Sequence, residues 1–392
     1  MLITLVVYQG VLLGLGYWAR NRSQTTEGYF IGGRNLGPWV TALSYAAGSS
    51  SAWSILGVSG IAFSQGVSSF WLVPGTLTGH LIVWFWIAPK IQQLSHQHRW
   101  LTLTDMLAFG LQGRAASLTY RISAVVILFS FTFYIAAQFQ GAANTFTAAF
   151  GFDFLTALLL GATVVVIYTL WGGFWAVSVT DALQAGLMLV AALLLPIVAF
   201  IAVDGWAWLR AAASAVDEPY WSWLGGHGGW FGLGFMLGTL SIGFGPLGQP
   251  HLLNRLMAMK SAKDIRLART VALSWFVLVL CGMYLLGVCA HVLLTTQVEP
   301  EQVFFVMADR LLPTVFTGVL IAGVLSAIMS TADSQLLVAG AAIHHDLQRA
   351  KGVAPYATKG SAQGAVKNAA RFAVFAVALA AVLLASLLPS ML

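Results

Sequence analysis

Four oxygen-bearing side chains lie close together inside an otherwise apolar stretch of the chain. Ser326, Ser330, Asp333 and Ser334 follow the spacing i, i+4, i+7 and i+8, which places them on one face of a helix. Polar groups within hydrocarbon are costly, so they usually face a partner, a cavity or an ion. Hydroxyl, carboxylate and carbonyl oxygens are ligands that small hard cations prefer. The pattern therefore predicts a cation site on this face.

Two further polar features are expected at the same depth in the membrane. Residues 44–53 are rich in Ser, Gly and Ala, and glycine weakens a helix. At a rise of about 1.5 Å per residue, residues 47–51, Asp181 and Asp333 all lie roughly 12–18 Å from one membrane face. We therefore predict a sodium site, in which the expected ligands are the carbonyls of Ala47, Ser50 and Ala327 and the hydroxyls of Ser330 and Thr331. The alternative is that these hydroxyls only bond carbonyls of their own helix or hold helices together.

Asp181 supports a second hypothesis. With Ser334 and Asp333 it could form a second site for a cation or a proton. Asp181 and Asp333 are the acidic residues that lie well inside the expected spans. The alternative is a structural role for Asp181, as an acid that caps a helix near the interface.

The elements that must position these residues are membrane helices. Hydrophobic residues make up 59% of the chain and charged residues 8%, against about 25% charged in soluble domains. The run at 2–19 lacks a basic start and a small-residue cleavage site, so we interpret it as a retained helix. Apolar runs of spanning length recur, and we expect ten spans, at approximately 2–19, 39–62, 67–89, 119–148, 153–171, 173–203, 229–250, 271–296, 311–343 and 369–391.

Basic residues fall mostly on one side of these spans. Of the 19 Lys and Arg residues, all except Arg210 and Arg310 lie in alternate loops that share one face. The positive-inside rule assigns that face to the cytoplasm and the N-terminus to the outside of a multi-pass protein of the cell membrane. Topology and contact with the lipid bilayer explain the net charge of +6 without a nucleic-acid partner.

Two spans are poor continuous helices. Gly, Ser and Pro interrupt 39–62 and 229–250, and non-helical backbone at this depth must be shielded or line a cavity. Broken helices at matching positions in two halves are typical of transporter binding sites. The sequence thus predicts one transmembrane transporter domain, 1–392, with an extra helix at 1–19, a repeat at 39–203, and an inverted, incomplete repeat at 229–392.

Other residues narrow the class of protein. The sequence has no P-loop, nucleophile triad or Cys cluster, and its histidines form no catalytic box, so an enzyme is not expected. Tyr134 and Gln138 interrupt an apolar span. Tyr134 could line a solute cavity beside Trp53, although such aromatics are often packing residues.

With these residues, the chain resembles the sodium:solute symporter family, and within it the sodium/proline symporters. The resemblance extends over about residues 1–390 and rests on Tyr29–Pro38, Ser44–Trp53, Gly172–Asp181, Gly248–His251 and Met329–Thr331. It implies an all-α, LeuT-like inverted-repeat fold with an extra N-terminal helix, and Na⁺ as the coupling ion.

The resemblance also implies roles for single residues. Ala47, Ser50, Ala327, Ser330 and Thr331 match the family's sodium site, and Asp181 and Ser334 match a second sodium site of some members. Trp53, Tyr134 and Pro250 match positions implicated in solute binding by proline carriers. The chain departs from those carriers at Ser49, at Ser51-Ala52 and at Ile242 and Pro246. The candidate solute residues are therefore Ser49, Ser51, Trp53, Tyr134, Gln138 and Pro250.

These observations predict a sodium-coupled symporter that imports a small organic solute, such as proline, another amino acid or a small carboxylate, by alternating access. Three alternatives remain open: a non-transporting product that is truncated or needs a partner, a membrane sensor of the same fold, and coupling to protons instead of sodium. The sequence does not indicate an oligomeric state.

Overall fold

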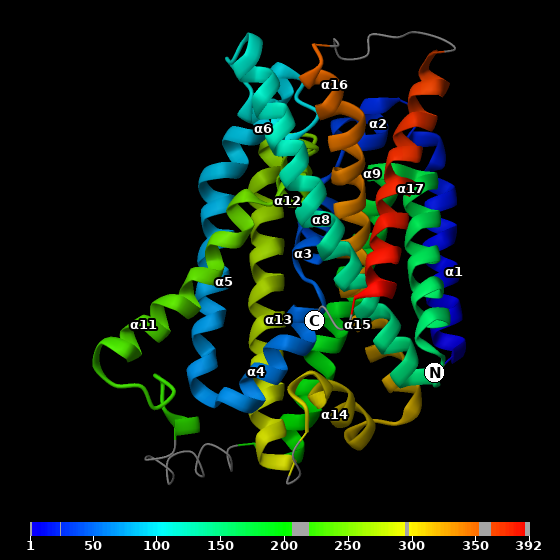
Figure 1. Cartoon of the computed structure of the whole chain (residues 1–392). Helices are drawn as coiled ribbons and strands as arrows, with labels where there is room; N and C mark the ends of the chain where they lie inside the picture. Colours follow the sequence, from blue (N-terminus) through cyan, green and yellow to red (C-terminus); the bar gives the residue numbers. More distant parts are fainter. Residues whose placement is uncertain (1, 24, 206–218, 295–297, 353–361, 389–392) are drawn as a thin grey trace.

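The computed structural model describes residues 2–23, 25–205, 219–294, 298–352 and 362–388, and helices form nearly all of this part of the chain (Figure 1). The helices run side by side between two ends of the molecule. We call one end, where α2 (Thr26–Ile31), α6 (Ala88–His98) and α16 (Leu347–Ala350) lie, the basic end; it is at the top of Figure 1. Arg34, Arg99 and Arg349 lie there.

Eight helical segments within the described residues are long and apolar enough to cross a membrane. Two of them, Trp53–His98 and Phe154–Ala202, have 46 and 49 residues, whereas one crossing needs about 20. Each of these two segments therefore covers parts of two expected spans. The eight segments, together with the short α3 (Pro38–Ser49), thus correspond to the ten expected spans. The remaining long helices are α1 (Leu2–Ala19), α8 (Gly113–Phe150), α13 (Ile265–Leu293), α15 (Thr314–Ala341) and α17 (Ala362–Leu387).

Helix α9 (Phe154–Ala202) turns back on itself at Gly173. This glycine has φ 57° and ψ −154°, a conformation that other residues rarely adopt, and it lies against Tyr29. In a straight helix Tyr168 and Asp181 would be about 20 Å apart. Instead, Tyr168 hydrogen-bonds Asp333, and Asp181 also lies near enough to Asp333 to interact with its charge. The reversal confirms the boundary expected between the fifth and sixth spans.

The second span is broken where its composition predicts. Helix α3 ends at Ser49, and Ser50 is extended, with φ −110° and ψ 95°. The helix resumes after Ser51, first as a π-helical turn, η3 (Trp53–Gly57), and then as α4 (Val58–Gln65). The backbone is therefore non-helical at 50–51, in the middle of the expected span.

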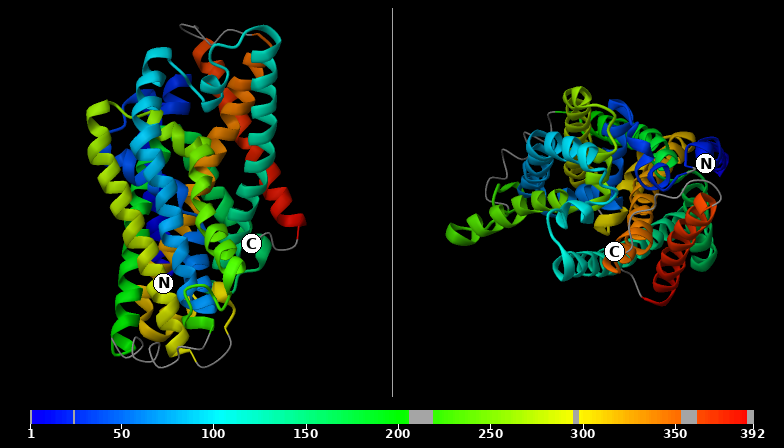
Figure 2. Two further views of the ribbon diagram at one scale, coloured as in Figure 1. Left: turned by 90° about the vertical axis from the view of Figure 1, so that its left-hand side faces the viewer. Right: turned by 90° about the horizontal axis from the view of Figure 1, so that it is seen from above.

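The seventh span is broken as well. Helix α11 (Gly229–Leu240) leads into a 3-10 segment, η7 (Ser241–Gly248), and Gln249 is extended before α12 (Pro250–Met257) begins. A Cβ atom on Gly79 of α5 (Leu72–Ile82) would lie 1.8 Å from the carbonyl oxygen of Gly243. Only glycine permits this close approach. Beyond this contact, α11 projects away from the bundle (Figure 2).

Helix α15 is the most buried of the spans, with 83% of its apolar window inside the protein, against at most 50% for the others. It packs against α9, α8, α17, α3 and α1. Polar side chains on α15 are thus shielded from lipid by other helices. The face that carries Ser326, Ser330, Asp333 and Ser334 is fully enclosed, with each side chain at most 2% exposed.

Candidate functional site

The break after α3 lies directly beside the polar face of α15. The Ser330 hydroxyl is 3.1 Å from the carbonyl oxygen of Ala47 and 3.4 Å from that of Ala327. The Thr331 hydroxyl is 3.1 Å from the Ala327 carbonyl oxygen. Ser50 follows this cluster along the chain, with its N–H on the Ala47 carbonyl at 3.0 Å. Four of the five expected sodium ligands are therefore in mutual contact, and the fifth adjoins them.

The chemistry of this cluster fits a small hard cation. All the candidate ligand atoms are neutral oxygens, which sodium prefers, and the residues are at most 3% exposed. The alternative interpretation is partly visible too, because Ser330 and Thr331 each lie within hydrogen-bonding distance of the carbonyl four residues earlier. Only the Ser330 contact to Ala47 crosses between helices. That contact goes beyond back-bonding within one helix; it fits a site between two elements and also the alternative in which the hydroxyl holds two helices together.

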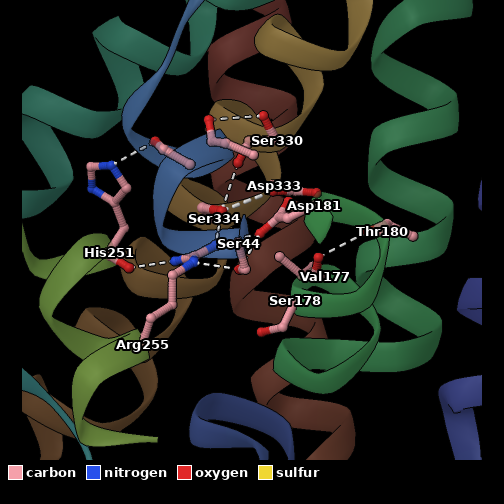
Figure 3. A network of polar contacts seen from close by, with 12 residues as sticks. Ser44, Val177, Ser178, Thr180, Asp181, His251, Arg255, Ser330, Asp333 and Ser334 are labelled. Carbon is pink, nitrogen blue, oxygen red and sulfur yellow. Dashed lines mark hydrogen bonds and ion pairs between the residues drawn. The ribbon is translucent and has the colours of Figure 1, made fainter. Parts of the chain in front are cut away.

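The position expected for a second cation is filled by a side chain (Figure 3). Arg255 of α12 lies between Asp181, Ser334 and Ser44, and Nη2 is 2.7 Å from Asp181 Oδ2. Nη2 also donates to the Ser334 hydroxyl, and Nε donates to Ser44 Oγ at 2.6 Å. The sequence had placed Arg255 in a basic loop, but its side chain is only 1% exposed. The grouping of Asp181 with Ser334 is thus present, with the Arg255 guanidinium bound to both side chains.

Asp333, the third member of that expected site, faces a different partner. Its Oδ2 accepts a hydrogen bond from Tyr168 at 2.7 Å, and its Oδ1 lies 3.0 Å from Ser334 Oγ. Tyr8 of the extra N-terminal helix reaches the same face, 2.9 Å from the hydroxyl of Ser326. Helices α1 and α9 therefore complete the polar face of α15.

A cavity of about 210 Å³ opens beside the break. Ser49, Ser50, Ser51 and Trp53 line it from the broken segment, and Tyr134 lines it from α8. Four of the six expected solute residues, Ser49, Ser51, Trp53 and Tyr134, are thus brought together. Because drug-sized ligands usually need about 300 Å³ or more, this cavity suits a smaller solute.

The other two expected solute residues lie elsewhere. Gln138 is buried in α8, with its Oε1 unpaired among the described residues, but does not line this cavity. Pro250 begins α12 and lines a separate apolar groove between α8 and the α12 start. In their place, the positions at which the chain departs from proline carriers, Ile242 and Pro246, line the cavity, as does the neighbouring Gln249.

An aromatic wall closes the far side of the cavity, and sequence reasoning did not identify it. Phe276 and Trp275 come from α13, and His80 comes from α5. The His80 ring stacks on Phe276 with centroids 3.7 Å apart, and His80 Nδ1 is 3.0 Å from Tyr45 OH. These residues are isolated in apolar runs, so no local pattern marks them. The sequence contains only a weak indication for Arg255: it is a single cationic residue among mostly apolar residues, directly after a broken helix.

The chain is similar to several known proteins over most of its length. The model of the sodium:solute symporter family matches residues 29–391. The osmoregulated proline transporter OpuE of Bacillus subtilis is 35% identical over 354 residues, which is 89% of this chain and 71% of the relative. The sodium/proline symporter of Escherichia coli is 34% identical, over 98% of this chain and 77% of the relative.

A solved structure shows the fold. A Na⁺-coupled sialic acid symporter in a substrate-bound, outward-open state matches with a TM-score of 0.81, over 98% of this chain and 81% of that one. The two sequences are 18% identical, so the likeness concerns the fold alone. It confirms the expected all-α, LeuT-like architecture with an extra N-terminal helix.

Proposed function

The chain belongs to the sodium:solute symporter family, a family of membrane transporters, and we propose from this premise that it imports a small organic solute together with sodium. Sodium would bind to the Ala47 and Ala327 carbonyls and the Ser330 and Thr331 hydroxyls, with the Ser50 carbonyl completing the set. The solute would bind in the neighbouring cavity. No chemical reaction is involved; the two ligands move through the membrane by alternating access.

One observation carries this proposal: the same short backbone segment serves both ligands. Ala47 contacts the ion cluster, Ser50 adjoins it and also lines the cavity, and Ser49 and Ser51 line the cavity on either side. An ion that bridges Ala47 and Ser330 would fix the end of α3 against α15. Because that end forms one wall of the cavity, bound sodium would favour solute binding, which is the energetic coupling that symport needs.

The cavity favours a solute without net charge. Among the described residues, those that line it include hydroxyl, aromatic and apolar side chains and His80, with no carboxylate, lysine or arginine. In general, carbonyl groups at the end of a helix can hold an ammonium group, and N–H groups at a helix start can hold a carboxylate. A zwitterionic amino acid meets both requirements. Because the relatives cited above transport proline, we propose proline as the first solute to test.

The proposed orientation follows from charge. Arg34, Arg99 and Arg349 lie at the basic end, which the positive-inside rule assigns to the cytoplasm. The N-terminus starts at the opposite end (Figure 1) and would lie outside the cell membrane.

Uptake in proteoliposomes tests the proposal. Purified protein is reconstituted, and labelled L-proline uptake is measured at fixed pH with an inward sodium gradient, an inward choline gradient or an inward proton gradient. We expect accumulation only with sodium. Uptake driven by protons alone would indicate proton coupling. The absence of uptake for proline and a panel of neutral amino acids would favour a sensor or a non-transporting product and overturn the proposal.

A further inference from the structure

Arg255 forms an ion pair inside the bundle that no part of the proposed transport reaction uses. Its side chain is 1% exposed and that of Asp181 is 0% exposed. Burial of a charge pair is costly unless the geometry is good and the remaining hydrogen-bonding groups are satisfied. All three guanidinium nitrogens of Arg255 have oxygen partners, and Asp181 Oδ2 accepts from Ser44 and Arg255. Asp181 Oδ1 has no hydrogen-bond partner among the described residues, so this carboxylate depends on the Arg255 charge for its compensation.

Oxygen atoms surround the guanidinium group of Arg255 in the way that they would surround an ion. Asp181 Oδ2 comes from α9, the Ser334 hydroxyl from α15, the Ser44 hydroxyl from α3, and the carbonyl oxygen of His251 from α12 itself. A carboxylate, two hydroxyls and a carbonyl are ligands for a hard monovalent cation. The ring of Phe174 lies 5.8 Å from the guanidinium carbon and closes the set.

We propose that the Arg255 guanidinium serves as a built-in cation, which occupies the position of a second coupling ion, so that each transport cycle carries a single sodium. The inference rests on the proposed function, because it concerns the number of ions coupled to the solute. Arginine keeps its charge at all physiological pH values. It therefore neutralises the negative charge of Asp181 permanently. Without Arg255, a cation from solution would have to balance that charge.

The connection to the proposed sodium site explains why this charge matters. Ser334 accepts from Arg255, and the Ser334 hydroxyl lies 2.6 Å from the carbonyl oxygen of Ser330, whose own hydroxyl reaches Ala47. The fixed cation thus orders the α15 turn that presents Ser330. It also joins α12, which directly follows the seventh span, to α3, α9 and α15. A covalently attached cation does not cross the membrane, so one net charge moves per neutral solute.

Three variants test this inference: Arg255→Gln, which removes the cation; Arg255→Lys, which keeps it; and the double variant Asp181→Asn/Arg255→Gln, which removes both charges. For each, the unfolding temperature in detergent is measured against sodium concentration, with choline chloride holding ionic strength constant. Sodium-dependent uptake is measured in parallel. The wild type, Arg255→Lys and the double variant should respond to sodium with a Hill coefficient of about 1.

Arg255→Gln removes the guanidinium from beside Asp181, so that a sodium ion can bind there. The Hill coefficient of the sodium response of this variant should therefore rise toward about 2. The variant should also be less stable than the wild type in choline and regain stability in sodium. A Hill coefficient for Arg255→Gln equal to that of the double variant, with no more stabilisation by sodium than the double variant shows, would overturn the inference and leave only a structural ion pair.

A second measurement keeps the inference testable if Arg255→Gln does not fold. The ratio of charge to solute moved by the wild type can be obtained from the membrane potential that stops net flux. A ratio of one supports a single sodium, and a ratio of two overturns the inference. A wild type that shows no sodium response at all would instead refute the proposed function, so the two failures are distinguishable.

Discussion

The hydroxyl of Ser330 on α15 lies 3.1 Å from the carbonyl oxygen of Ala47, at the last turn of α3. This contact joins the most buried helix of the bundle to a helix that stops in the middle of the membrane. Any ion that replaced it would hold the same two elements together. The stability of the broken segment and the occupancy of the ion site should therefore depend on each other.

Ser330→Ala should weaken sodium binding by about tenfold or more, because a hydrogen-bonding or ion-ligating oxygen with a charged partner is worth about 1.5–3 kcal/mol. The fold should persist, since the alanine side chain fits wherever serine fits. The sodium concentration that gives half-maximal uptake measures the effect. Ser64→Ala is the matched control, because Ser64 also lies within hydrogen-bonding distance of the carbonyl four residues earlier, at 3.0 Å, but is in the last turns of α4, 13 residues beyond Ser51. Equal sodium dependence in both variants would contradict the assignment of Ser330.

Trp53→Ala should weaken solute binding and leave the sodium response intact. Trp53 lines the cavity, and buried aromatic anchors commonly contribute about 2 kcal/mol or more to binding. We expect the KM for the solute to rise at least about tenfold. The unfolding temperature should still increase with sodium as in the wild type. Trp39→Ala is the control, because Trp39 is 58% exposed on α3. A loss of the sodium response together with solute binding would show that Trp53 supports the break rather than the solute.

The sequence predicts which residues of the candidate sodium site lie close together, because the determinants of their positions are local; the binding of an ion there stays a prediction. Glycine and serine density marks the break at 50–51, and helical spacing marks the polar face of α15. The number of residues from the membrane edge then gives the depth of both. These quantities depend on residues close together in the chain, so no knowledge of tertiary packing is required.

The sequence does not predict that the Arg255 side chain is buried in the bundle. The depth of a residue in the membrane can be counted along the chain, but it does not tell which side of the helix the residue faces. Arg255 is 74 residues from Asp181, and a basic residue after a span resembles a loop residue that sets topology. Gln249 has an extended backbone immediately before α12, and this bend in the chain precedes the helix that carries Arg255. The sequence also does not predict that His80 and Phe276 line the cavity, because each is isolated in an apolar run and the side of the helix that it faces cannot be counted along the chain. The division of the chain into repeats at 39–203 and 229–392 stays a prediction.

Gly173→Ala should destabilise the protein strongly. A side chain at φ 57° and ψ −154° is strained, and the added Cβ would lie 2.7 Å from the ring of Tyr29. Strained backbone of this kind costs about 1–3 kcal/mol, and the steric contact adds to it. Gly14→Ala on α1 is the control, since its Cβ would meet nothing within 4 Å. Thermal unfolding in detergent should show a lower unfolding temperature for Gly173→Ala only. Equal stability of the two variants would mean that α9 reverses by another route.

Asp105 links Tyr120 of α8 and His345 at the basic end of the bundle. Burial raises the pKa of this carboxyl, but hydrogen bonds from His345, Tyr120 and the Leu101 N–H and the interaction with the His345 charge outweigh burial and hold the pKa at about 2, below the ordinary 3.8. A depressed carboxyl pKa stabilises the fold at pH values above the ordinary pKa, and this contribution is lost as the pH falls from about 4 toward 2. At about 1.4 kcal/mol per pKa unit, the contribution at neutral pH is about 2 kcal/mol.

Asp105→Asn should therefore lower the unfolding temperature at pH 7, because the amide cannot accept the same set of hydrogen bonds from Tyr120 of α8 and from His345 in η10 (Ala342–Asp346), the segment after α15. The gap between the variant and the wild type should narrow as the pH is lowered to about 3, since the Asp105 carboxyl of the unfolded chain, with its ordinary pKa of 3.8, takes up a proton there while the folded carboxyl stays mostly charged. Asp309→Asn, an exposed acid on α14 (Val303–Leu311), is the control and should have little effect at either pH. A gap that stays constant with pH would show that Asp105 acts through packing and neutral hydrogen bonds. The charge of its carboxylate would then not be what joins α7 (Leu103–Leu107) to η10.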